Sequence, residues 1–82
     1  MKPIDFLKEY LNEIKPIEMN DNEFLKYRYL DNHLDSFEII QFIMAIEEEF
    51  GITLLPEDTE SEEFRTIEGA IKIIESKKSY EI

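Results

Sequence analysis

Cysteine is absent from this chain of 82 residues, which excludes disulfides and thiolate chemistry and favours a reducing compartment. There is also no apolar run long enough to cross a bilayer, and residues 1–5 lack the form of a secretion signal. We therefore expect a cytoplasmic protein without membrane insertion. A chain of this length makes one small domain over residues 1–82, with a core too thin for an ordinary catalytic pocket. We also expect a monomer.

Lysine and arginine are missing from residues 29–64, a stretch of 36 residues that contains 11 Asp or Glu. The net charge of the whole chain is −11. Nucleic acids and anionic membranes are therefore poor partners for this stretch. A basic patch on another protein is a good partner, through electrostatic steering that weakens as salt rises. The alternative interpretation is a solvated acidic surface that only keeps the protein soluble.

The common signatures of catalytic and metal sites are missing as well. There is no Gly-x-Ser-x-Gly sequence, and His33, the only histidine, has no recognisable third group to orient it as a base. The polar residues around Asp31 do not follow the spacing of an EF-hand, and the bend lacks glycine. We expect neither catalytic residues nor a metal site.

Apolar residues recur at helical spacing in several stretches, which predicts an all-α fold of about four short helices. The first helix is expected over residues 3–15, with Pro16 ending it. Residues 16–34 form a connection too long to be structureless, and its aromatic and apolar residues are expected to fold back onto the core.

The second helix is expected over residues 36–50, with Gly51 stopping it. A short extended piece then leads to Pro56, which starts a brief, irregular third helix. Thr66 is the expected N-cap of the last helix, where Gly69 indicates close packing. We expect residues 79–82 to be frayed.

The start of the second helix carries the most informative hydroxyl of the chain. Asp35 is the expected N-cap, and Glu38 is its reciprocal partner in a capping box. Ser36 then lies at the first helical position, where free backbone N–H groups and the helix dipole favour a phosphate esterified to the serine. His33 is expected in the loop close to that phosphate. The arrangement suits holding a phosphate and suits catalysis poorly.

This second helix has two apolar faces. One arc holds Ile39, Phe42, Ile43, Ile46 and Phe50, and it is expected to face the core. A second arc holds Phe37, Ile40 and Met44, with Gln41, Glu47 and Glu48 along its border. An exposed apolar strip edged by carboxylates is a reasonable docking surface. Alternatively, the connection over residues 16–34 covers it.

The run Leu-Asp-Ser-Phe-Glu over residues 34–38, followed by Met-Ala-Ile-Glu-Glu-Glu-Phe over residues 44–50, resembles the acyl carrier protein family. Pro56-Glu57-Asp58 and Thr66-Ile67 also fall where that family begins its third and fourth helices. The resemblance covers essentially the whole chain. It implies a four-helix bundle of the acyl carrier protein type, with a short third helix and a long first loop.

The resemblance also implies a function and its residues. Ser36 would carry a 4'-phosphopantetheine arm, attached by a phosphopantetheinyl transferase from coenzyme A, and the arm would hold acyl or aminoacyl groups as thioesters. Acyl-transferring and condensing enzymes with basic patches would then be partners, in fatty-acid, lipid, polyketide or related biosynthesis. By position, the partner contacts would be Asp35, Phe37, Glu38, Ile40, Gln41, Met44, Glu47 and Glu48. The acyl-chain pocket would be lined by Ile46, Leu55, Phe64, Ile67 and Ala70.

Three features depart from the carriers of fatty-acid synthesis. His33-Leu34 replaces a pair of small residues, Phe37 replaces leucine, and Gln41 replaces a frequent acid. This form is more similar to discrete carriers of dedicated pathways. The rival function from another class is an unmodified acidic helical adaptor, which would need no hydroxyl at position 36.

Overall fold

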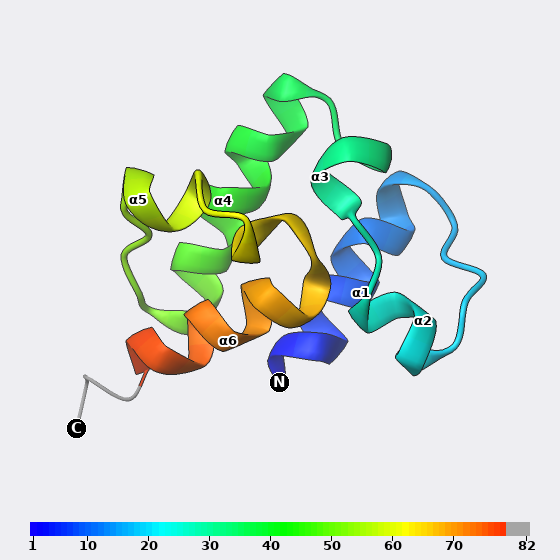
Figure 1. Cartoon of the computed structure of the whole chain (residues 1–82), viewed down its shortest axis with the longest axis horizontal. Coiled ribbons are helices and arrows are strands. Elements are labelled where there is room, and N and C mark those ends of the chain that lie inside the picture. Colours follow the sequence, from blue (N-terminus) through cyan, green and yellow to red (C-terminus); the bar gives the residue numbers. More distant parts are fainter. Residues whose placement is uncertain (79–82) are drawn as a thin grey trace.

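Helices account for all the regular structure in residues 1–78, the part of the chain that this computed structural model describes. Three long helices dominate, with a short helix and a 3₁₀ turn between the last two (Figure 1). They are α1 (Pro3–Ile14), α4 (Ser36–Phe50), α5 (Pro56–Thr59), η1 (Glu63–Arg65) and α6 (Ile67–Lys78). The all-α class and the brief third helix are thus confirmed. The expectation for residues 79–82 lies outside the described part.

Helix α1 begins at Pro3, whose missing N–H costs nothing at a helix start. It ends at Ile14, one residue before the predicted end, because Lys15 takes an extended backbone conformation. Leu7 and Leu11 recur four residues apart and are fully buried, so they attach this helix to the core.

The long connection after α1 folds into two short helices, α2 (Asp21–Leu25) and α3 (Tyr29–Asn32), which the sequence analysis did not anticipate. Asn20 caps α2 in a capping box with Glu23. Phe24 and Tyr29 are fully buried, which confirms that this segment folds back onto the core.

Gly51 ends α4 with a φ of 62°, a left-handed conformation that glycine adopts without steric penalty. The next residues alternate between the two sides of an extended segment. Ile52 and Leu54 are buried, whereas Thr53 and Leu55 are exposed.

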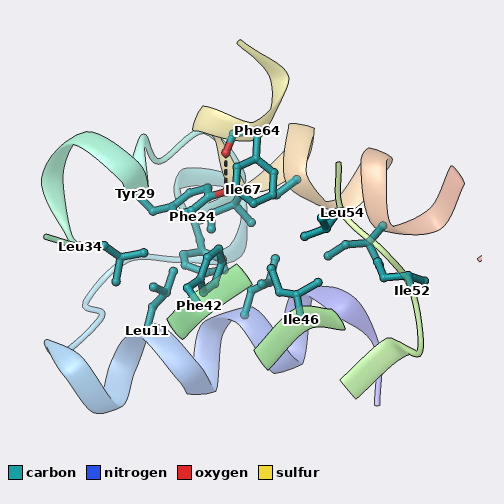
Figure 2. Close-up of a cluster of buried hydrophobic side chains, with 13 residues drawn as sticks. Leu11, Phe24, Tyr29, Leu34, Phe42, Ile46, Ile52, Leu54, Phe64 and Ile67 are labelled. Carbon is teal, nitrogen blue, oxygen red and sulfur yellow. Dashed lines mark hydrogen bonds between the residues drawn. The ribbon is translucent and has the colours of Figure 1, made fainter. Parts of the chain in front are cut away.

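The buried side chains form one continuous cluster between the helices (Figure 2). Its centre is aromatic: the Tyr29 ring lies 5.1 Å from Phe42 and 6.0 Å from Phe64, between ring centroids. The buried Tyr29 hydroxyl donates a hydrogen bond to the backbone carbonyl of Phe64, drawn as the dashed line in Figure 2. Burial raises the pKa of Tyr29, so this hydroxyl keeps its proton. The bond ties η1 to α3 from inside the core.

Candidate functional site

The first turn of α4 has the geometry that the sequence predicted. Asp35 is the N-cap, with extended backbone, and its carboxylate accepts from the N–H of Glu38 at 2.8 Å. The Glu38 side chain accepts in return from the N–H of Asp35 at 3.0 Å. This capping box is reciprocal, so the helix start is held by two side chains and Ser36 takes the first helical position.

Ser36 is exposed at the end of α4 that lies beside α3 (Figure 1). The first intrahelical hydrogen bond runs from the N–H of Ile39 to the carbonyl of Asp35, and the Asp35 side chain occupies the N–H of Glu38. The N–H groups of Ser36 and Phe37 therefore lie ahead of the helical hydrogen-bond ladder, at the positive end of the helix dipole. An exposed hydroxyl in this position fits a phosphate-linked group: it has room for a substituent, and backbone donors lie beside it.

His33 lies in the turn that follows α3, as expected, but its side chain is buried in the protein instead of being exposed beside the Ser36 hydroxyl. Its side chain is only 3% exposed. Its Nε2 lies 2.7 Å from the carbonyl oxygen of Leu11, and its Nδ1 lies 2.8 Å from the hydroxyl of Tyr27. Both ring nitrogens are satisfied inside the protein, which is the usual condition for a buried polar side chain.

The second apolar arc of α4 faces solvent. Phe37 is 67% exposed, Ile40 58% and Met44 62%. The connection over residues 16–34 therefore does not cover this strip, and the expected exposure is confirmed. The opposite arc faces the core, where Phe42 and Ile46 are fully buried. Gln41 and Glu48 are exposed along the border of the strip.

Glu47 lies in a different environment from Glu48. Its carboxylate accepts a hydrogen bond of 2.8 Å from the backbone N–H of Leu54, and its backbone carbonyl accepts from Ile52. The side chain therefore holds the segment after α4, a role that the sequence analysis did not identify. No pattern in the sequence separates Glu47 from Glu48, because only the path of the following loop brings Leu54 to one of them.

The residues suggested for an acyl-chain pocket fall into two groups. Ile46, Phe64, Ile67 and Ala70 are fully buried in the same cluster, and three of them are labelled in Figure 2. Leu55 is 42% exposed, and its neighbour Leu54 is directed into the core instead. The alternation of residues 52–55 was the signal that could have identified Leu54.

In residues 1–78 there is no group of three or more Asp, Glu or His side chains placed to hold a metal ion. Over the same residues, no helix combines the length and the apolar character needed to span a membrane.

Comparison with known proteins relates this chain to a family. The chain is 35% identical, over 78 residues, to proteins named acyl carrier protein in Rickettsia massiliae and Rickettsia prowazekii. It is 33% identical to the acyl carrier protein of Rickettsia canadensis. Each of these alignments covers 95% of this chain and 84% of the relative.

A scan against protein-family models found no match. A search of solved structures found none either. The relatives nevertheless align over nearly the whole chain at a level of identity that shows common descent, and the helical fold agrees with them. The chain belongs to the acyl carrier protein family.

Proposed function

We propose that this protein carries acyl or aminoacyl groups as thioesters on a 4'-phosphopantetheine arm attached to Ser36. The observation that supports this most directly is the exposed Ser36 hydroxyl at the first position of a well-capped, 15-residue helix. Membership of the acyl carrier protein family supports the carrier role in general. Residues 1–82 would act as one carrier domain.

The chain's own residues would anchor and present the arm rather than perform bond chemistry. Asp35 and Glu38 hold the helix start, so the attachment point is fixed relative to the rest of α4. When attached, the arm supplies a terminal thiol for the thioester. A tether of this kind raises the concentration of the cargo at each partner enzyme.

The exposed strip on α4 is the proposed docking surface for those enzymes. It starts next to Ser36, so a partner that covers the strip also reaches the attachment point. Because Lys and Arg are missing from residues 29–64, the surrounding charge favours partners with basic patches. The proposed partners are a phosphopantetheinyl transferase and acyl-transferring or condensing enzymes. The proposed contact residues are Phe37, Glu38, Ile40, Gln41, Met44, Glu47 and Glu48.

Intact mass tests the attachment. The protein is incubated with coenzyme A, magnesium and a broad-specificity phosphopantetheinyl transferase, and we expect a mass gain of one phosphopantetheine group. Ser36→Ala should show no gain, whereas Ser76→Ala, which changes another exposed serine, should be modified like the wild type. Failure of the wild-type protein to gain mass would favour the unmodified adaptor.

Substitution within the strip tests docking. Met44→Glu places a charge on the exposed face, so we expect the kcat/KM of modification to fall while the free energy of unfolding changes by less than about 0.5 kcal/mol. Phe42→Ala on the buried arc is the contrast and should cost about 3–5 kcal/mol in stability. Equal losses of stability and turnover in Met44→Glu would show that the strip belongs to the core.

A further inference from the structure

Apart from Tyr29 with its hydroxyl, His33 is the one buried polar side chain in the described part of the chain, and it lies close in sequence to the exposed attachment point. It is 3% exposed, whereas Asp35 and Ser36, two and three residues further on, are exposed. Leu34 between them is also buried. The chain therefore leaves the interior within one residue of the N-cap of α4.

The hydrogen bonds of His33 define where its proton lies. The carbonyl of Leu11 can only accept, so Nε2 carries the proton and donates to it at 2.7 Å. In the neutral ring Nδ1 then accepts from the Tyr27 hydroxyl at 2.8 Å. Burial raises the pKa of Tyr27, so its hydroxyl remains a donor at neutral pH.

These bonds connect the entry to α4 with two other parts of the fold. Leu11 lies in the last turns of α1, where its carbonyl also accepts from the N–H of Lys15. Tyr27 lies between α2 and α3, its ring meets the His33 ring edge-on at 5.6 Å, and its carbonyl accepts from the N–H of Ile67 at the start of α6. The His33 imidazole is therefore bonded both to α1 and to the segment between α2 and α3, two residues before the N-cap Asp35.

We propose that His33 is a positioning residue for the modification of Ser36, an inference that rests on the attachment proposed above. The hydrogen bonds to Leu11 and Tyr27 hold the segment that enters α4, and thereby hold the Ser36 hydroxyl in one orientation toward the transferase. His33 does not touch the transferase, because its side chain is buried. Its contribution is a restraint on the geometry of attack, and small displacements of a reacting atom have large effects on rate.

This role predicts a division between the kinetic constants. The exposed strip on α4 is unchanged when His33 is replaced, so the KM for the carrier should stay close to the wild-type value. His33→Leu should lower kcat on the order of tenfold. Tyr27→Phe, which removes only the donor to Nδ1, should lower kcat less. His33→Gln can still donate to the Leu11 carbonyl, and it should recover most of the rate lost in His33→Leu.

The control is a variant that loses stability away from this segment. Ile74→Val removes one buried methylene from α6 and leaves the His33 hydrogen bonds intact. All variants are compared at a temperature at which circular dichroism shows each to be folded. Hydrogen exchange of the Glu38 amide, which is bonded to Asp35, reports the N-cap directly and needs no transferase.

The proposal predicts faster exchange at Glu38 and a lower kcat in His33→Leu and Tyr27→Phe, with Ile74→Val like the wild type in both. It is overturned if the His33 and Tyr27 variants match Ile74→Val in kcat and in Glu38 exchange, since His33 would then contribute only to packing. A wild-type protein that gains no mass refutes the attachment to Ser36 and, with it, a role of His33 in modification. Unchanged Glu38 exchange would separately refute the restraint itself.

Discussion

Two adjacent glutamates near the end of α4, Glu47 and Glu48, lie in different environments in the folded chain. Glu47 accepts a hydrogen bond from Leu54, whose side chain is buried, whereas Glu48 is exposed. The carboxylate of Glu47 therefore satisfies a backbone donor in a segment that covers the core. Glu48 contributes charge to the border of the exposed strip on α4.

We expect the replacement of Glu47 to affect stability and the replacement of Glu48 to affect association with a partner. Glu47→Ala leaves the N–H of Leu54 without its acceptor and should lower the free energy of unfolding by about 1–2 kcal/mol, measured by urea denaturation. Glu48→Ala should change stability by less than about 0.5 kcal/mol. It should instead slow association with the transferase, most strongly at low salt. A Glu48 effect that does not depend on ionic strength would contradict steering.

At the scale of elements, the contact between η1 and α6 depends on Gly69. A Cβ atom at this position would lie 1.7 Å from the carbonyl oxygen of Glu63, closer than any real contact. The glycine therefore lets the backbone of η1 approach the first turns of α6, which confirms the close packing that the sequence predicted. Thr66 completes this junction by accepting from the N–H of Gly69 at 3.3 Å.

Replacing Gly69 by alanine should therefore lower stability, although the same replacement usually raises the stability of a helix. On an exposed helical face, Gly→Ala stabilises by about 1 kcal/mol. Here we expect Gly69→Ala to destabilise by about 1–3 kcal/mol, because the backbone of η1 must move. Thermal unfolding measures the change. Ser76→Ala on the exposed side of the same helix is the control and should be neutral or slightly stabilising.

At the scale of the whole molecule, an ion pair between Asp58 and Lys77 connects the acidic middle of the chain to its last helix. The Nζ of Lys77 lies 2.7 Å from the carboxylate of Asp58, which also accepts from the N–H of Leu55 at 2.9 Å. Desolvation alone raises the pKa of Asp58. The hydrogen bonds from Lys77 and Leu55, with the charge of Lys77, outweigh it, so the pKa lies below its ordinary value of 3.8. The pair links the short helix α5 to α6.

The lowered pKa predicts a pH dependence of stability. The carboxylate of Asp58 stabilises the fold above the pKa of the unfolded chain, and this contribution is lost as pH falls through the lower pKa of the folded state. We expect Asp58→Asn to be less stable than the wild type by up to about 1 kcal/mol at pH 7. The difference should shrink as pH falls below about 4.

The chain contains 20 Asp and Glu residues, so the measurement is the difference in unfolding free energy between variant and wild type at each pH. Asp21→Asn is the matched control, because Asp21 pairs with Lys8 in a far more exposed position. Its difference from the wild type should stay near zero over the same range. A constant gap for Asp58→Asn would contradict the assignment to the Lys77 pair.

Local patterns explain why so much of this fold could be predicted. The start of α4 is set by residues three positions apart, Asp35 and Glu38, and its end by a single glycine. The two arcs of α4 follow from helical periodicity alone, since a small fold can bury only one side of a helix. Ser36 is exposed at a helix start for the same local reasons.

The positions that differed from expectation depend on contacts between residues far apart in the chain. His33 is buried because the carbonyl of Leu11, 22 residues earlier, and the hydroxyl of Tyr27 meet it there. The helices α2 and α3 are too short to show a period, and burial of Phe24 and Tyr29 holds them in place. Spacing along single segments was enough to predict the long helices, the capped serine and the exposed apolar strip, because each of these features depends on neighbouring residues only. The folded chain was needed to show that His33 and Glu47 make internal hydrogen bonds, because their partners are distant in sequence or lie across a loop and become neighbours only on folding.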